Sequence, residues 1–258
     1  MVLLIDIGNT NVVIGVYEDD RLLFVSRFSS LHVSTADEFA VTLKSLLSIY
    51  NIDSKQIDGS IISSVVPQIT RYFVGGIELI LGKTPKVVGP GLKTGINIKI
   101  DNPAQLGSDL LVDSVAAAAK YQKPCIVIDM GTATTLSVVT ENNEFIGGAI
   151  IPGVKISLDA LSSKTAQLPG IAFDAPERTI GKNTVECMQS GIVYGYSCML
   201  DGMIDRFEAE LGRKCTVVAT GGLSKFFCDN MRREVISDEN LMLEGLYILY
   251  KKNYTKEA

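Results

Sequence analysis

The sequence predicts an α/β protein built from two related domains, because one pattern of residues occurs twice in the chain. In both places an apolar strand ends in an Asp-x-Gly turn, a threonine follows shortly after the glycine, and a second apolar strand begins. The first copy lies within residues 2–17 and the second within residues 125–139. A chain of 258 residues is also long enough for two medium-sized domains. We expect the domains to span residues 1–115 and 116–258.

The first turn, from Asp6 to Asn11, has the residue types of an anion-binding loop. Gly8 lacks a Cβ, Asn9 tolerates left-handed φ, and Thr10 adds a hydroxyl, so the tip can direct its amides toward one anion. Asp6 ends a buried strand, where a charge is costly without a partner such as a metal ion.

The rest of the first half predicts a third strand and then alternating helices and strands. The third strand covers residues 21–28, and a capping-box pattern from Thr35 to Glu38 opens a helix that reaches about Asn51. Further expected elements are a strand at 60–66, a helix at 68–81, a short strand at 86–88 and a helix at 110–120.

The second half repeats this opening and then adds helices. The expected elements are a strand at 144–151, a helix at 154–162, an irregular excursion at 163–182, a long helix at 185–211, a strand at 215–219, a short helix at 223–228 and a closing helix at 239–251. In the long helix, Gly191 and Gly195 lie one turn apart. Such small residues allow close packing, either against the chain's own sheet or against a second subunit.

Composition excludes several classes of protein. The formal net charge is −5, and the Lys and Arg residues are scattered, so no nucleic-acid surface is expected. No apolar stretch is long enough for a membrane span, and the amino terminus lacks a signal-peptide pattern. We therefore expect a cytoplasmic protein without a membrane partner.

The cysteines and the histidine exclude further chemistry. The five cysteines are odd in number and have apolar neighbours, which favours reduced core thiols over disulfides or zinc ligands. His32 is the only histidine and lies far in sequence from both turns. A Ser-His-Asp or Cys-His nucleophilic site is therefore not expected.

The duplicated strand-turn-strand pattern resembles the phosphate-binding hairpins of actin, the sugar kinases and Hsp70. In those proteins two related domains hold the phosphates of ATP. The resemblance implies two ribonuclease H-like (actin-like ATPase) domains, each with a mixed five-stranded sheet flanked by helices. It also implies that the turn Thr220-Gly221-Gly222 lies near adenosine.

Over essentially the whole chain, the sequence resembles the type III pantothenate kinases. The matching motifs are Asp6-Ile7-Gly8-Asn9-Thr10, Asn102-Pro103 with Gly107-Ser108-Asp109, Asp129-Met130-Gly131-Thr132-Ala133-Thr134, Gly148-Ala149-Ile150-Ile151-Pro152-Gly153, Asn183-Thr184 with Gln189-Ser190-Gly191, and Thr220-Gly221-Gly222. The resemblance implies an enzyme that uses ATP to phosphorylate pantothenate to 4′-phosphopantothenate, the first step of coenzyme A biosynthesis. It further implies a cytoplasmic homodimer that uses Mg²⁺ and a monovalent cation, K⁺ or NH₄⁺.

The resemblance also assigns roles to individual residues. The first phosphate-binding turn would comprise Asp6, Ile7, Gly8, Asn9, Thr10, Asn11, Val12 and Val13, and Thr132 would contact ATP. Asp129 would hold the monovalent cation, and Asp6 is a second candidate metal ligand. Gly107, Ser108, Asp109 and Leu110 would bind pantothenate, together with Thr184 across the dimer interface.

Asp109 has two interpretations. Its spacing alone indicates a carboxylate that complements the dipole of the helix it begins. The family resemblance instead implies that it accepts the proton of the substrate hydroxyl, as phosphoryl transfer to an alcohol requires.

Two positions depart from the family pattern. The family usually has Arg directly after the catalytic Asp and Tyr two residues before the Asn-Pro, where this chain has Leu110 and Ile100. Loss of a charge-assisted contact of the Arg costs about 1.5–3 kcal/mol. Two alternatives therefore stay open: a nucleotide-binding paralogue with weak or no kinase activity that acts as a regulatory or accessory protein, and a kinase for another small alcohol.

Overall fold

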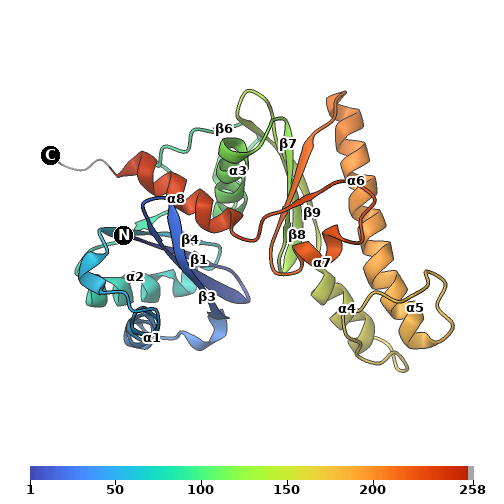
Figure 1. The fold of residues 1–258 in the computed structure, drawn as a ribbon, viewed down its shortest axis with the longest axis horizontal. Coiled ribbons are helices and arrows are strands. Elements are labelled where there is room, and N and C mark those ends of the chain that lie inside the picture. The colour runs from blue at the N-terminus through green and yellow to red at the C-terminus, as the bar shows by residue number, and fades with distance from the viewer. Residues whose placement is uncertain (255–258) are drawn as a thin grey trace. The chain divides into compact units, whose positions relative to one another are not determined.

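A computed structural model describes residues 1–254, apart from the side chain of His32. The chain forms two compact units, each with its own sheet and helices (Figure 1). Unit 1 comprises residues 1–96, residues 101–116 and the segment from Leu241 onward, and unit 2 comprises residues 97–100 and 117–240. The sequence assigns that last segment to the second domain, whereas its helix packs on the sheet of unit 1.

The sheet of unit 1 has five strands in the order β3-β2-β1-β4-β5. They are β1 (Val2–Ile7), β2 (Asn11–Glu18), β3 (Arg21–Ser29), β4 (Gly59–Ser64) and β5 (Lys86–Val87). β1 is antiparallel to β2 and parallel to β4, so the sheet is mixed. This arrangement confirms the mixed sheet expected for the first domain.

Helices cover both faces of this sheet (Figure 1). α1 (Ala36–Ile49) and α2 (Pro67–Leu81) share one core with Leu3, Ile5 and Ile7 of β1. Because side chains alternate along a strand, Leu4 faces the opposite side, where α8 (Leu241–Asn253) packs. β1 is therefore enclosed on both faces.

Local sequence signals explain where α1 and α8 lie. The predicted capping box is confirmed, since the Glu38 amide donates to Thr35 Oγ1 (3.2 Å) and the Thr35 amide donates to Glu38 Oε2 (3.1 Å). Gly15 of β2 permits the close approach of α8, because a Cβ there would lie 2.8 Å from Leu243 Cδ1.

The sheet of unit 2 has six strands in the order β11-β10-β7-β8-β9-β6. They are β6 (Asn97–Ile98), β7 (Cys125–Met130), β8 (Ala133–Val139), β9 (Glu144–Pro152), β10 (Thr216–Thr220) and β11 (Ile236–Ser237). Five of them repeat the order of unit 1, with β7 in the place of β1. The sixth strand was not expected: β6 is a two-residue edge strand, too short to show an alternating pattern.

The remaining helices range from single turns to α6, and one long helical stretch contains a π-helical segment. They are η1 (Ser30–His32), η2 (Ser54–Gln56), η3 (Pro103–Gln105), α3 (Ser108–Lys120), α4 (Val154–Ser163), α5 (Thr184–Ser190), the π-helical η4 (Gly191–Gly195), α6 (Tyr196–Leu211) and α7 (Ser224–Cys228). The predicted helix at 185–211 is thus α5, η4 and α6. A Cβ at Gly191 or Gly195 would meet no atom of the described residues within 4 Å outside its own helix, so packing of these glycines against the chain's own sheet is wrong.

The cysteines are free thiols, as predicted, but not all of them are buried in the core. All five cysteines are free. Cys125 is buried, as expected of a core thiol, but Cys187 in α5 and Cys198 in α6 are exposed. In the described part of the chain, no helix combines the length and the apolar character needed to cross a membrane.

Gly76 is expected to resist replacement by alanine, because α1 and α2 touch at this residue. A Cβ there would lie 2.7 Å from Phe39 Cδ1 and 2.8 Å from Ala36 O. Overpacking of this kind costs about 1–3 kcal/mol, so Gly76→Ala is expected to lower the free energy of unfolding by that amount in a urea titration followed by circular dichroism.

The matched control is Gly202→Ala in α6, where a Cβ meets no atom within 4 Å. Its expected effect is a gain of up to about 1 kcal/mol from helix propensity. Equal effects of the two substitutions would contradict the tight contact at Gly76.

Candidate functional site

The first Asp-x-Gly turn joins β1 to β2. The Gly8 amide donates to Asn11 O (3.0 Å) and closes the turn, whose tip residues Asn9 and Thr10 are exposed. Neither Gly8 nor Asn9 has a positive φ, so the turn does not use the left-handed conformation that Asn9 tolerates. The turn is shaped instead by its contacts with the end of β3.

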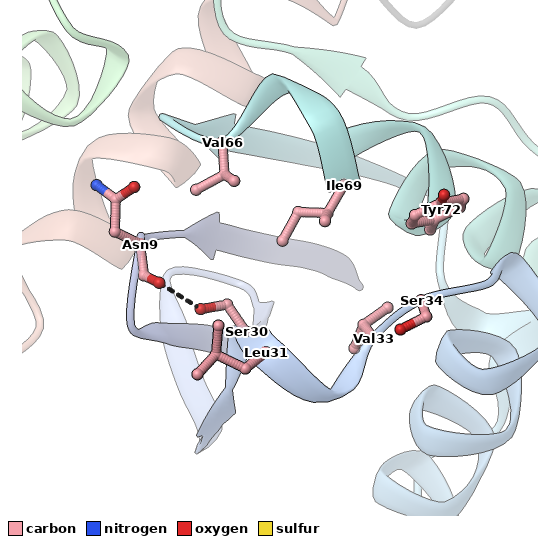
Figure 2. Close-up of a pocket in the computed structure, with 8 residues that line it drawn as sticks. All are labelled: Asn9, Ser30, Leu31, Val33, Ser34, Val66, Ile69 and Tyr72. Atoms are coloured by element: carbon pink, nitrogen blue, oxygen red, sulfur yellow. Dashed lines mark hydrogen bonds between the residues drawn. The ribbon is translucent and has the colours of Figure 1, made fainter.

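Ser30, directly after β3, fixes the orientation of this tip. Its amide donates to Thr10 O (3.1 Å), and its hydroxyl donates to Asn9 O (3.0 Å; Figure 2). In a trans peptide the carbonyl and the following amide point in opposite directions. The N–H groups of Thr10 and Asn11 therefore point away from Ser30.

A cavity of about 280 Å³ lies beside this tip (Figure 2). It is lined by Asn9, Ser30, Leu31, Val33, Ser34, Val66, Ile69 and Tyr72. Its walls are mainly apolar and its volume is below that of most ligand pockets. A larger cavity of about 890 Å³ lies at the other end of β1, beside Met1 and Val2, and contains none of the predicted site residues. Neither cavity has the lining expected of a phosphate-binding site, so the candidate site is assigned from the exposed turn itself.

Asp109 lies in the first turn of α3, as the sequence predicts. Its Oδ1 accepts the Leu110 amide at 2.8 Å. A Cβ on Gly107 would collide with this Oδ1, so a glycine at position 107 is needed for the carboxylate to lie here. Burial raises the pKa of Asp109 above its ordinary value, and the amide of Leu110 opposes that shift. The geometry is compatible with a helix-dipole partner and with a proton acceptor.

β4 brings the two unit 1 motifs together. In the sheet register Asp6 lies beside Ser63, and the Ser63 and Ser108 hydroxyl oxygens are 3.1 Å apart. The first Asp-x-Gly turn and the start of α3 therefore both border the end of β4.

The second Asp-x-Gly turn, in unit 2, joins β7 to β8. The Gly131 amide donates to Ala133 O (3.1 Å), and Gly131 and Thr132 are exposed. Asp129 lies beside Thr135 and Thr220 in the sheet register. As in unit 1, a buried strand thus delivers a carboxylate and an exposed polar turn to one edge of a sheet.

Two glycines support this second turn at close range. A Cβ at Gly221 would lie 2.6 Å from Met130 O, and Gly221 has a φ of +95°. A Cβ at Gly153 would collide with Thr132 O. The predicted Thr220-Gly221-Gly222 turn and the Gly148–Gly153 motif therefore both contact the turn that carries Thr132.

The predicted metal ligands are single carboxylates. Among residues 1–254, with the side chain of His32 left aside, no group of three or more His, Cys, Asp or Glu side chains could hold a metal ion. Asp6 and Asp129 each interact with other protein groups. A cation at either would also need oxygens from backbone, water or a bound phosphate.

Thr184 is the predicted site residue that stands apart within unit 2. It is exposed in the first turn of α5, whose start is capped by Asn183 accepting the Glu186 amide (3.0 Å). Thr132 lies in the turn between β7 and β8, so the two predicted site residues of unit 2 belong to different elements.

Ser30 and Ser63 are supporting residues that the sequence did not reveal as such. Their partners are separated from them by 21 and 45 positions. Neither hydroxyl belongs to a spacing pattern, so sequence offers no signal for these contacts.

The comparisons with known proteins cover nearly the whole chain. The profile of the type III pantothenate kinase family matches residues 2–206. A type III pantothenate kinase from Moorella thermoacetica is 44% identical over 253 residues, which cover 98% of this chain and 100% of the relative. One from Halalkalibacterium halodurans is 42% identical over 253 residues with the same coverage.

Solved structures show the same fold at low sequence identity. A conserved putative Baf family transcriptional activator from Campylobacter jejuni has a TM-score of 0.62 and 18% identity, covering 97% of this chain and 98% of its own. A putative N-acetylglucosamine kinase from Porphyromonas gingivalis has a TM-score of 0.51 and 12% identity, covering 99% and 100%. The chain therefore has the actin-like and sugar kinase type of fold.

Gly221→Ala is expected to destabilise the protein more than a change at a glycine with similar backbone and free space. Gly212 is the matched control, since its φ is +68° and a Cβ there meets no atom within 4 Å. Both variants incur left-handed strain, but only Gly221→Ala adds a steric clash of about 1–3 kcal/mol. Urea unfolding of both variants measures the difference, and equal losses would show that the turn yields to a side chain.

Proposed function

The chain belongs to the type III pantothenate kinase family, and we propose on that premise that it transfers the γ-phosphoryl group of ATP to the primary hydroxyl of pantothenate. The product is 4′-phosphopantothenate, formed in the first step of coenzyme A biosynthesis. The observation that carries the proposal is the full-length similarity to type III pantothenate kinases, which accompanies two intact polar turns at the ends of buried strands.

The first turn, formed within Asp6 to Val13, is proposed to bind phosphate of ATP. Its support is the orientation of the Thr10 and Asn11 amides, which Ser30 fixes from the opposite side. Backbone amides arranged in this way bind anions without a basic side chain, which suits a chain of net charge −5. Asp6 is proposed as a ligand of Mg²⁺, which neutralises phosphate charge when bound.

The second turn is proposed to serve ATP through Thr132 and a monovalent cation through Asp129. Thr132 is exposed on a turn that Gly153 and Gly221 support closely. Asp129 supplies a carboxylate oxygen at the base of the same turn, and oxygen is the donor that K⁺ and comparable hard cations accept.

Asp109 is proposed as the proton acceptor. As the pantothenate oxygen forms its bond to the γ-phosphorus and the bond to ADP breaks, the hydroxyl proton passes to the carboxylate. Burial suits this role, because it raises the pKa of Asp109 and makes the carboxylate a stronger base than an exposed one.

The acceptor side is proposed to comprise Gly107, Ser108, Asp109, Leu110 and Thr184. Leu110 and Ile100 are half-buried, and Ile100 Cγ2 lies 3.8 Å from the position of a Cβ at Gly147 on β9. Both apolar side chains are therefore partly withdrawn from water. No observation favours a different acceptor or a purely regulatory protein.

We also propose that the chain works as a homodimer in the cytoplasm. Unit 2 leaves large apolar side chains exposed, among them Ile150, Ile180 and Val185 at 72%, 84% and 41% exposure. Gly191 and Gly195 are exposed, and a Cβ at either would meet no described atom within 4 Å outside its own helix, which favours a contact with a second subunit. A second copy covering these residues would bury the apolar surface.

The function is tested by ADP release from ATP in Mg²⁺ and K⁺, with and without pantothenate. Asp109→Asn is expected to lower kcat by about 10²–10⁴-fold, because the amide cannot accept the proton. ATP affinity, measured by calorimetry, is expected to stay within about twofold. Pantothenate-independent release by the native protein would overturn the assignment of the acceptor.

The pH dependence follows from the raised pKa of Asp109. The base is active when deprotonated, so the rate falls as pH drops through a pKa above the ordinary 3.8, and that limb is absent in Asp109→Asn. Asp37→Asn is the control, since Asp37 is an exposed carboxylate in the first turn of α1. If the rate depends on pH in the same way in Asp109→Asn and Asp37→Asn, Asp109 is a dipole partner and not the base.

Removal of the monovalent cation tests Asp129. Exchange of K⁺ for tetramethylammonium is expected to lower the native rate by about tenfold or more, since a bound cation contributes several kcal/mol of charge stabilisation. Asp129→Asn is expected to be slow in both buffers. Asp159→Asn, at an exposed position of α4, is expected to lose rate on removal of K⁺ to the same extent as the native protein. Full activity of Asp129→Asn in K⁺ would contradict the role.

A further inference from the structure

We propose that Ser63 is a positioning residue for Asp109 and that it acts through the hydroxyl of Ser108. The inference rests on the proposed role of Asp109 as the base. Ser63 is the penultimate residue of β4 and is fully buried, and Ser108 begins α3 directly before Asp109. The two hydroxyl oxygens are 3.1 Å apart.

The surrounding bonds determine which serine donates. Ser108 Oγ donates to Ser64 O (3.0 Å) and accepts the Ser64 amide (3.1 Å). A serine hydroxyl has one proton and two acceptor sites. Its single proton is used on Ser64 O, so the proton between the two hydroxyls comes from Ser63. Ser108 Oγ then makes all three of its hydrogen bonds within the protein.

This arrangement fixes the first turn of α3 onto the end of β4. Because the Ser108 hydroxyl is fully used, Ser108 can contact the substrate only through its backbone, and its hydroxyl holds the turn that carries Asp109. Gly107 makes room for the carboxylate in this position, since a Cβ there would collide with Asp109 Oδ1. The place of the carboxylate is thus set by β4 through two serines.

The end of β4 is itself anchored to α2. The Ser64 hydroxyl accepts the Val66 amide (3.1 Å) and lies 2.7 Å from Thr70 Oγ1, which donates to Val66 O (3.0 Å). These bonds hold the peptide of Ser64 against the start of the helix. The support under Ser108 is therefore a connected set of hydrogen bonds and is expected to be stiff.

The test compares Ser63→Ala with Ser60→Ala. Ser60 lies on the same strand and is 1% exposed, but its hydroxyl has no hydrogen-bond partner, so its removal deletes a buried hydroxyl without touching Ser108. Ser63→Ala is expected to lower kcat for pantothenate-dependent ADP release by about threefold to tenfold, as loss of one hydrogen bond predicts. The KM for ATP is expected to change by less than about twofold, and Ser60→Ala to leave both constants within about twofold.

Two further measurements separate positioning from general damage. Hydrogen exchange of the peptide covering residues 106–112, followed by mass spectrometry without substrate, is expected to be faster in Ser63→Ala than in Ser60→Ala. In the Asp109→Asn background, Ser63→Ala is expected to cause no further loss of rate, because it acts only through Asp109.

Each outcome decides the proposal. Unchanged exchange in Ser63→Ala overturns it whatever the rates are. An equal loss of rate in the native and Asp109→Asn backgrounds overturns it as well, since Ser63 would then act independently of the carboxylate. Full activity of Asp109→Asn alone would overturn the base assignment and this inference with it, and that result does not depend on Ser63.

Discussion

Burial of β1 on both faces is the constraint on which unit 1 depends. Leu3, Ile5 and Ile7 face the core of α1 and α2, while Leu4 faces the side of α8. A strand covered in this way has no room for polar side chains until it ends, so the first polar group, Asp6, and the exposed turn come together at one edge. The chemistry of the unit is placed by where the apolar run stops.

Unit 2 applies the same constraint with different supports. β7 is buried in the way β1 is, and Asp129 takes the place of Asp6 at its end. The first turn is held by hydrogen bonds from Ser30, whereas the second is supported by backbone that approaches at Gly153 and Gly221. The duplicated pattern therefore conserves the geometry of strand and turn within each unit and not the contacts that stabilise it.

The sequence predicted what depends on local pattern. The two turns, the capping box of α1 and the place of Asp109 at the start of a helix follow from residue types at short spacing. It could not place β6, whose two residues show no period, or assign α8 to unit 1, since both depend on partners far along the chain. The hydroxyl contacts of Ser30 and Ser63 were missed for the same reason. Whether Asp109 is a base or a dipole partner is a question that local spacing leaves open, because both roles need a carboxylate in that turn.

The return of the last helix to unit 1 has a consequence for biosynthesis. A ribosome makes the strands of unit 1 first and α8 last, with all of unit 2 between them. Until Leu243 and its neighbours leave the exit tunnel, the face of β1 that carries Leu4 lacks α8, and the nascent sheet exposes apolar surface. Unit 2 has its whole sequence available earlier. The half of the chain that is synthesised first is thus expected to be the half that finishes folding last.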